Sequence, residues 1–196
     1  MENVYVVDIE SLKAKIRQFT KGNFHVIADF DQTLTKAFID GQKAHTTIAQ
    51  IREGKYLTKD YPEKAHALFD KYHPIEVSHD ISDEEKDKKM LEWWRTHLEL
   101  MIKSGMNKNV INDIVKSKRL TGRDKLPEFL KLLSKNNIPM LVLSAGYGDI
   151  IKGYLEFNNL LSNNMHIISN FLILQVLAMQ LDTNLRLCIH AIKMRL

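Results

Sequence analysis

The feature that most constrains the fold is a short apolar run that leads directly into a pair of aspartates. Residues Phe24 to Ala28 are mostly apolar, and the string DFDQTLT, Asp29 to Thr35, follows at once. A short apolar run bounded by polar residues is typical of a buried strand in a parallel sheet. Ligands bind beyond the carboxyl ends of such strands, so the sequence predicts a site in this loop.

A second strand and loop follow much later in the chain. Apolar residues recur at helical spacing from Leu126 to Leu133, and the run Pro139 to Leu143 then predicts a strand. The string SAGYGD, Ser144 to Asp149, comes next and is expected to open another helix. Strands that alternate with helices in this way predict an α/β fold with a parallel sheet.

The segment between the two loops is predicted to be an all-helical insertion. Its apolar residues recur three or four positions apart, and little in it indicates a strand. We therefore expect an α/β core from residues 1–35 and 119–171, a helical cap from residues 36–118, and an atypical tail from residues 172–196. A further helix is predicted from Ile9 to Phe19. The apolar positions of the cap are Tyr61, Ala65, Leu68, Phe69, Leu91, Trp94, Leu98, Met101, Val110, Ile111, Ile114 and Val115.

Composition and charge exclude several classes of protein. The 28 basic and 24 acidic residues are interspersed along 196 residues, so no nucleic-acid partner is expected. The single cysteine, Cys188, has no partner for an internal disulfide. The first ten residues lack the pattern of a secretory signal, and the apolar stretch from Phe171 to Leu181 is shorter than the roughly 20 residues that cross a bilayer. We expect a cytoplasmic monomer with no membrane partner.

Two carboxylates separated by one residue suit phosphoryl transfer. Asp29 can attack phosphorus and form an aspartyl-phosphate, and Asp31 can protonate the leaving oxygen and later deprotonate a water. A Mg²⁺ ion bound by carboxylate oxygens would neutralise the negative charges that otherwise repel each other. A bare DxD string is more often a turn that binds nothing. The full string DFDQTLT after an apolar strand favours the catalytic interpretation.

The SAGYGD loop offers what a phosphate needs. It provides the hydroxyl of Ser144, the backbone N–H groups around Ala145 and Gly146, and glycines that let the backbone approach a ligand closely. Many glycine-containing loops bind nothing, so this loop alone is weak evidence. The ordered pair of loops after separate strands is strong evidence for a phosphate site.

These strings resemble the haloacid dehalogenase superfamily and, within it, the cytosolic 5'-nucleotidase III, or pyrimidine 5'-nucleotidase, family. The resemblance implies a Rossmann-like parallel sheet core with an inserted helical cap, and Mg²⁺-dependent hydrolysis of nucleoside 5'-monophosphates. The shared strings are DFDQTLT at Asp29 to Thr35, PIEVSHD at Pro74 to Asp80, MLEWWRTH at Met90 to His97, SAGYGD at Ser144 to Asp149 and IISNF at Ile167 to Phe171.

The resemblance also implies a role for each site residue. It makes Asp29 the nucleophile and a Mg²⁺ ligand, and Asp31 the acid/base, which binds the metal through its main-chain carbonyl. It assigns phosphate binding to Ser144 and Ala145, and nucleoside contacts to Glu76 and the Trp93 region of the cap.

The chemistry of the two cap residues is compatible with nucleoside binding. The carboxylate of Glu76 can accept hydrogen bonds from the amine or ring N–H of a base, although an exposed cap carboxylate explains the residue equally well. Trp93 and Trp94 can each stack on a base. Adjacent helical positions point about 100° apart, so one of the two is expected in the core.

The family pattern ends after Phe171. Family members continue with a lysine loop, a strand and a GDSxGD-type loop, whereas residues 172–196 are mostly apolar and contain Asp182 as their only acidic residue. We therefore expect a core that is incomplete at its C-terminus, through truncation or a frameshift. Two alternatives to an active nucleotidase stay open: an inactive product that at most binds nucleotide or a partner, and another small-molecule phosphatase of the superfamily. The base, pyrimidine or methylated purine, also stays open.

Overall fold

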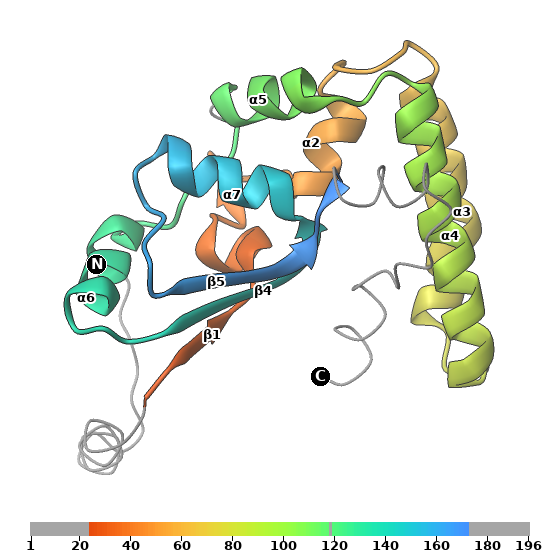
Figure 1. Cartoon of the computed structure of the whole chain (residues 1–196). Coiled ribbons are helices and arrows are strands. Elements are labelled where there is room, and N and C mark those ends of the chain that lie inside the picture. Colours follow the sequence, from red (N-terminus) through yellow and green to blue (C-terminus); the bar gives the residue numbers. More distant parts are fainter. Residues whose placement is uncertain (1–23, 118, 173–196) are drawn as a thin grey trace.

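A computed structural model describes residues 24–117 and 119–172 (Figure 1). The helix predicted from Ile9 to Phe19, the tail that follows Leu172 and the single Cys188 lie outside these residues. No helix of the described part is long and apolar enough to span a membrane.

The centre of the fold is a parallel sheet with the strand order β1-β4-β5. Its strands are β1 (Val26–Ala28), β4 (Met140–Tyr147) and β5 (Met165–Asn170). Met140 pairs with Val26 on one side and with Met165 on the other, and both pairings are parallel. The carboxyl ends of all these strands therefore lie at one edge of the sheet, and the predicted α/β fold with a parallel sheet is confirmed.

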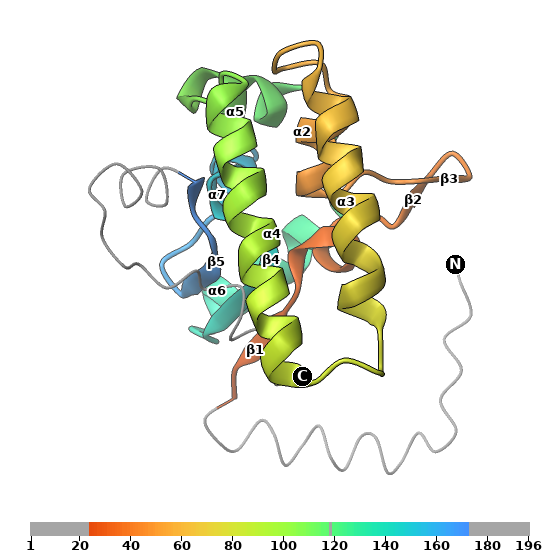
Figure 2. The same cartoon turned by 90° about the vertical axis from the view of Figure 1, so that its right-hand side faces the viewer.

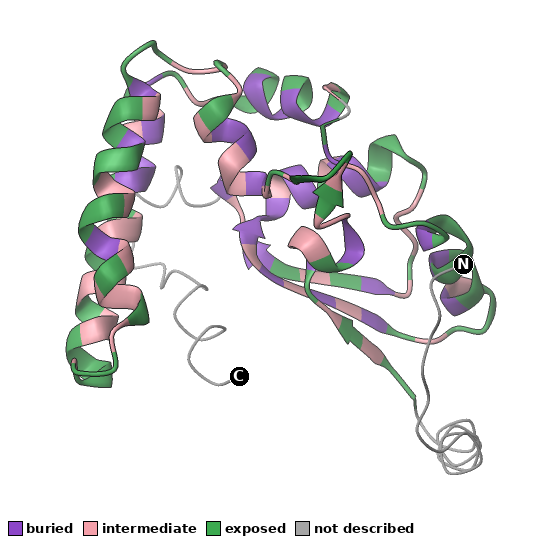
Figure 3. Ribbon diagram, turned by 180° about the vertical axis from the view of Figure 1, so that it is seen from behind, coloured by how far each residue is buried: buried purple, intermediate pink, exposed green. Residues whose placement is uncertain are grey.

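Helices cover one face of this sheet. Helix α7 (Gly148–Phe157) packs on β4 and β5, and helix α6 (Leu126–Lys135) contributes further buried leucines. Val142 on the covered face is fully buried, whereas Ile27 and Ile168 on the opposite face are 57% and 42% exposed. Figure 3 shows that the strands of the sheet have both buried and exposed stretches. The prediction that the first strand is buried is therefore wrong for its outward face. Its position is right, but among the described residues β1 is an edge strand that helices cover on one side.

The inserted segment is not wholly helical, which corrects a second prediction. It begins with a hairpin of β2 (Phe38–Ile39) and β3 (Gln42–Lys43). Asp40 and Gly41 form the turn with φ values of 50° and 78°, as an Asp-Gly pair does in a tight hairpin. This dipeptide was a hairpin signal in the sequence. The helices α2 (Thr47–Glu53), α3 (Tyr61–Val77), α4 (Asp83–Lys103) and α5 (Lys108–Lys116) follow.

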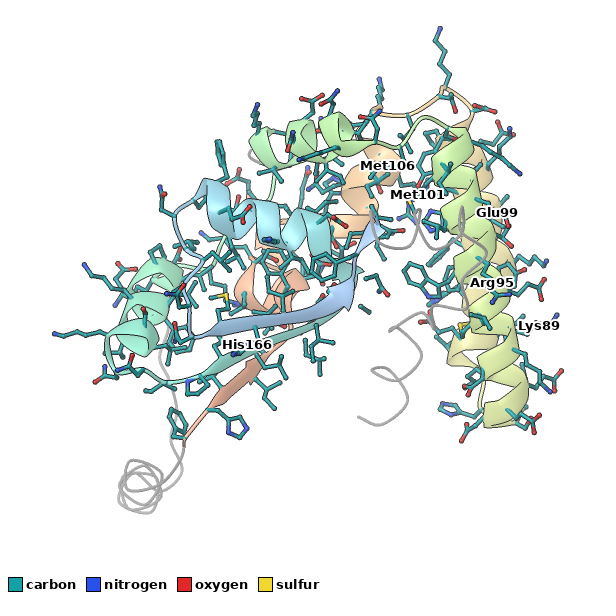
Figure 4. All side chains as sticks on the ribbon, viewed as in Figure 1. Lys89, Arg95, Glu99, Met101, Met106 and His166 are labelled. Carbon is teal, nitrogen blue, oxygen red and sulfur yellow. The ribbon has the colours of Figure 1, made fainter. Side chains whose placement is uncertain are left out.

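Helices α3 and α4 pack side by side and stand beyond the carboxyl ends of the strands (Figures 1 and 2). In Figure 4 the labelled residues of α4 run along the helix from Lys89 to Met101. Met101 lies at the end of the helix that is next to α2. Met101 is fully buried, as are Ile51 of α2 and Ile114 of α5. These side chains belong to one hydrophobic core with those of the sheet, so cap helices and sheet are joined by continuous packing.

Candidate active site

The first site loop follows β1 without an intervening residue. Asp29 caps the turn Phe30–Leu34, and its Oδ1 accepts a hydrogen bond of 2.7 Å from the backbone N–H of Phe30. Phe30 is fully buried and packs edge to face against Tyr154 of α7. The buried phenylalanine between the two aspartates thus anchors the loop, while the side chain of Asp29 lies at the exposed surface.

The loop is held in an unusual backbone conformation. Gln32 has a φ of 60°, which lies in the left-handed region. This conformation is energetically unfavourable for any residue other than glycine. The hydroxyl oxygen of Thr35 accepts a hydrogen bond of 2.8 Å from the N–H of Gln32, and the side-chain amide of Gln32 donates to the carbonyl of Ala44. These bonds fix the turn that carries both aspartates.

Arg123 braces the same loop from the outside. Its Nε donates to the carbonyl of Thr33 at 2.6 Å, and a terminal guanidinium nitrogen donates to the carbonyl of Gln32 at 2.9 Å. Its backbone N–H donates to the carbonyl of Leu34 at 2.9 Å. The sequence interpretation missed this residue, because nothing local to Arg123 indicates contact with a loop so far back in the chain.

The carboxylate of Asp31 is bound to helix α2. Its Oδ1 accepts from the backbone N–H of Thr47 at 2.9 Å, and its Oδ2 accepts from the hydroxyl of Thr47 at 2.8 Å. Burial raises the pKa of Asp31 to about 6, the hydrogen bonds from Thr47 oppose that rise, and the negative charge of Asp29 adds to it. A carboxyl group with a pKa near neutrality can both give and take a proton at physiological pH.

The second site loop is an extension of β4. The strand was predicted to end at Leu143, but it continues to Tyr147 because β5 pairs with it as far as Asn170. Ser144 is buried, and its hydroxyl oxygen accepts a hydrogen bond of 3.2 Å from the N–H of Gly146. The sequence indicated this loop but not the strand structure within it.

Two polar side chains of β5 hold the backbone of this loop. The hydroxyl of Ser169 donates to the carbonyl of Gly146 at 2.8 Å, and the side-chain amide of Asn170 donates to the carbonyl of Ala145 at 2.9 Å. Both residues belong to the string IISNF, which the resemblance includes but to which it assigns no function. Their position beside the loop gives them a structural one.

Gly146 is the point at which the two loops meet. A Cβ atom at this position would lie 2.4 Å from Oγ1 of Thr47, 3.0 Å from Oδ2 of Asp31 and 3.3 Å from Oγ of Ser144. A side chain has no room there, so glycine is required by the close approach. The structure thus brings Asp31 and Ser144, predicted from separate loops, to the same place.

Glu76 and Trp93 lie on the cap helices, away from that contact. Oε2 of Glu76 lies 3.1 Å from Nδ1 of His73, and the ring of His73 stacks on Phe69 with centroids 4.5 Å apart. Phe69 in turn meets Trp93 edge to face, with centroids 6.2 Å apart. The structure therefore joins Glu76 and Trp93 through one aromatic group, here called the cap aromatic group: Phe69, Tyr72, His73 and Trp93.

Trp94, rather than Trp93, packs against the hydrophobic core. Its ring meets that of Tyr147 edge to face, with centroids 6.1 Å apart. Because Tyr147 ends β4, this contact connects helix α4 to the loop that carries Ser144. The expectation that one of the two adjacent tryptophans belongs to the core is confirmed, and the structure decides which one.

The described site offers oxygen ligands suited to a magnesium ion. Mg²⁺ is usually held by one or two carboxylates together with other oxygen ligands, waters and substrate phosphates, and the carboxylate of Asp29 and the main-chain carbonyl of Asp31 can supply two such oxygens. A third acidic side chain, Asp149, accepts a hydrogen bond of 2.5 Å from the backbone N–H of Leu172. Within residues 24–117 and 119–172 no group of three or more His, Cys, Asp or Glu side chains is placed to hold a metal.

Comparison with known families gives a match over most of the chain. A family model described as Pyrimidine 5'-nucleotidase (UMPH-1) matches residues 32–184. The matched range includes the cap, the Ser144 loop and β5, and it starts directly after the Asp29 and Asp31 pair. It also runs past Phe171, where the sequence interpretation had placed the end of the family pattern, into residues outside the described part.

Individual relatives agree with that match. A Caenorhabditis elegans protein named after cytosolic 5'-nucleotidase 3 is 33% identical over 178 residues, which is 88% of this chain and 47% of that protein. The 7-methylguanosine phosphate-specific 5'-nucleotidase A of Xenopus laevis is 29% identical over 174 residues, 87% of this chain and 60% of that protein. The chain thus spans between 47% and 60% of the length of these two curated relatives.

A solved structure shows the same fold. The crystal structure of cytosolic 5'-nucleotidase IIIB bound to cytidine has a TM-score of 0.71 and 29% sequence identity. The similarity covers 87% of this chain and 59% of that chain. A share of 87% of the chain necessarily includes residues of both the sheet and the cap.

Proposed function

The chain belongs to the pyrimidine 5'-nucleotidase (UMPH-1) family, and on this premise we propose that it hydrolyses nucleoside 5'-monophosphates to nucleoside and phosphate. The observation that carries the proposal is the contact between the Asp31 loop and the Ser144 loop at Gly146. That contact brings the carboxylate of Asp31 close to the Ser144 loop, and Asp29 lies two residues before Asp31 on the same loop. The names of the relatives, and the cytidine bound to one of them, support a nucleotide as the substrate.

The proposed reaction has two displacements at phosphorus. A carboxylate oxygen of Asp29 attacks phosphorus, the bond from phosphorus to the 5' oxygen breaks, and Asp31 gives that oxygen a proton. A water then attacks phosphorus in the aspartyl-phosphate and loses a proton to Asp31. Phosphate leaves, and the carboxylate of Asp29 and the proton of Asp31 are restored.

The phosphate oxygens would be bound by the second loop. The hydroxyl of Ser144 and the backbone N–H groups of Ala145 and Gly146 are the donors proposed for them. A Mg²⁺ ion, held by the Asp29 carboxylate and the main-chain carbonyl of Asp31, would supply positive charge that reduces repulsion between nucleophile and phosphate. Hydrogen bonds from Ser169 and Asn170 hold the loop backbone before the substrate arrives, and the Gly146 N–H would exchange its bond to Oγ of Ser144 for one to phosphate.

The base is proposed to bind at the cap aromatic group. Trp93 would stack on the base, and Glu76 would accept hydrogen bonds from its amine or ring N–H. The support is that the structure joins both residues within one cluster on α3 and α4. This division assigns base recognition to residues 36–118 and phosphoryl chemistry to the core of residues 1–35 and 119–171. A cytosolic location is proposed from the name of the Caenorhabditis elegans relative.

The central experiment measures phosphate release from a panel of nucleoside 5'-monophosphates by the full 196-residue chain. We expect turnover that EDTA abolishes and Mg²⁺ restores. Asp29→Asn should lower kcat by roughly a thousandfold or more, because the amide is a poor nucleophile. Asp113→Asn, at an exposed position of α5, is the matched control and should behave as the wild type. Normal turnover in Asp29→Asn would exclude the proposed nucleophile.

A second candidate function is nucleotide binding without turnover. It is favoured by the small number of acidic groups at the described site, because residues 24–117 and 119–172 gather no third His, Cys, Asp or Glu with the pair Asp29 and Asp31. Calorimetric binding of a nucleoside monophosphate with no phosphate release would select this function. A preference for phosphoserine or a sugar phosphate over nucleotides would instead select another phosphatase of the superfamily.

A further inference from the structure

We propose that Thr47 is the positioning residue of the site, which holds the carboxyl group of Asp31 in the place from which it protonates the leaving oxygen. The inference rests on the proposed function, because it assumes that Asp31 acts as the acid and base. It adds a residue that neither the sequence interpretation nor the family resemblance had assigned. Three observations carry it.

The first observation is that Thr47 engages both oxygens of one carboxylate. Its backbone N–H donates to Oδ1 of Asp31 at 2.9 Å, and its hydroxyl donates to Oδ2 at 2.8 Å. Two bonds from one residue fix the plane of the carboxyl group as well as its distance. A single bond would leave the group free to rotate about its last torsion, which is broad for aspartate.

The second observation is that the hydroxyl of Thr47 has its direction fixed by another partner. The backbone N–H of Tyr147 donates to Oγ1 of Thr47 at 3.3 Å. A hydroxyl has one proton to donate, and here the acceptor side faces Tyr147 while the proton faces Asp31. The same atom thus links helix α2, the end of β4 and the carboxylate of Asp31.

The third observation is that the cluster has no room to rearrange. Thr47 is fully buried, and its β-branched side chain has few accessible rotamers. A Cβ atom on Gly146 would lie 2.4 Å from Oγ1 of Thr47, which shows how closely the backbone of the second loop approaches. Catalytic groups that are displaced by about 1 Å can lose roughly a hundredfold in rate, so this confinement bears directly on turnover.

A positioning role predicts a dependence on the leaving group. The 5' oxygen of a nucleoside is a poor leaving group and needs a proton as the bond to phosphorus breaks. The p-nitrophenolate ion leaves without one. Loss of the Thr47 hydroxyl should therefore slow the first displacement much more for a nucleotide than for p-nitrophenyl phosphate, whereas a general disturbance of the fold would slow it equally for both. Hydrolysis of the aspartyl-phosphate, in which Asp31 is the base, is common to both substrates, so the first displacement is followed as the pre-steady-state release of nucleoside or p-nitrophenolate.

The test compares Thr47→Val, which removes the hydroxyl and keeps the β-branch, with Thr47→Ser, which keeps the hydroxyl. In the full chain, Thr47→Val should slow nucleoside release in the first turnover by about 10- to 100-fold, and first-turnover release of p-nitrophenolate should slow by less than about threefold. Thr47→Ser should retain most of the wild-type rate. Thr96→Val is the matched control, since the exposed Thr96 donates to a backbone carbonyl of α4 far from the site.

Several outcomes would overturn the inference. They are a wild-type first-turnover rate with nucleotide in Thr47→Val, an equal loss of that rate on both substrates, and failure of Thr47→Ser to retain it. Thr47→Ala replaces Thr47→Val if thermal unfolding shows that the latter does not fold. An inactive wild-type chain would reject the proposed function instead. In that case crystal structures decide the positioning role: an Asp31 carboxylate displaced in Thr47→Val supports it, and an unmoved one overturns it.

Discussion

The hydroxyl of Tyr61 on α3 lies 3.0 Å from Nε2 of His97 on α4, and the two rings stack with centroids 6.2 Å apart. Both side chains are buried in the core that joins the cap to the sheet. Burial and, to a smaller extent, the positive charge of Arg52 lower the pKa of His97 to about 4. The imidazole is therefore neutral in the native protein, where its ring nitrogen can accept the proton of the tyrosine hydroxyl.

The first prediction is that protonation of His97 destabilises the protein at acid pH. The ordinary pKa of histidine is about 6.5, so the unfolded chain takes up this proton before the native one does. The contribution of neutral His97 to the free energy of unfolding is complete above pH 6.5 and is lost as the pH falls toward 4. The free energy of unfolding should fall by about 3 kcal/mol over this range from this residue.

Asp31 acts in the opposite direction, because its raised pKa favours the native state at acid pH. The effect of His97 is therefore measured as a difference between the wild type and His97→Gln, which cannot titrate but keeps a hydrogen-bond acceptor. Urea unfolding at several pH values should show a steeper loss for the wild type between pH 6.5 and 4. Parallel curves for the two proteins would contradict the prediction.

The second prediction concerns the hydroxyl of Tyr147, which is buried and has no hydrogen-bond partner among the described residues. A buried polar group without a partner costs free energy, and burial also raises the pKa of this tyrosine well above its usual value. Tyr147→Phe should therefore leave the protein equally stable or more stable, by up to about 1 kcal/mol. Thermal and urea unfolding measure the change.

Tyr72→Phe is the matched control for that prediction. Tyr72 is also buried, but its hydroxyl donates to Oε1 of Glu92 at 2.6 Å. Loss of this bond should destabilise the protein, so the two tyrosine substitutions should have opposite signs. A loss of stability in Tyr147→Phe comparable to that in Tyr72→Phe would show that the hydroxyl of Tyr147 has a favourable contact.

The third prediction is that Arg123 is needed for the geometry of the first site loop. Its guanidinium donates to two successive backbone carbonyls, those of Gln32 and Thr33. Arg123→Lys cannot reproduce this fork, because an ammonium group is a single point of charge. Both Arg123→Ala and Arg123→Lys should lower kcat on the order of tenfold, consistent with about 1.5 kcal/mol per charged hydrogen bond.

The control for Arg123 is Arg95→Ala, an exposed position on α4. This substitution removes the same charge and should leave phosphate release unchanged. Full activity in Arg123→Lys would mean that the positive charge alone, and not the fork, holds the loop. Equal effects at both positions would mean that net charge matters and the contact does not.

The fourth prediction separates base recognition from phosphoryl chemistry. Glu76→Ala should reduce nucleotide hydrolysis by about 1.5 to 3 kcal/mol, the range for a hydrogen bond to a charged group, and should spare p-nitrophenyl phosphate, which has no base. Glu99→Ala on the exposed side of α4 is the control. A parallel loss on both substrates would place Glu76 in the fold or in the chemistry instead of in base selection.

The sequence by itself determined the two strands that carry the site loops, the helical character of most of the insertion and the two site loops. The apolar runs, the Asp-Phe-Asp string and the Ser-Ala-Gly string are local features, and each depends on residues that are neighbours in the chain. The same is true of the long helices α3 and α4, whose apolar spacing was sufficient to predict them. The Asp40-Gly41 pair is a local hairpin signal of the same kind, which the prediction of an all-helical insertion overlooked.

Only the tertiary structure decided which residues support those loops. Thr47 and Asp31 are 16 residues apart in the chain, Arg123 and Thr33 are 90 apart, and Tyr147 and Thr47 are 100 apart. No periodicity or motif relates such positions, because each hydrogen bond depends on how the sheet, helix α2 and the loops pack. For the same reason the exposure of Ile27 and the packing of Trp94 against the core were settled by neighbours distant in sequence.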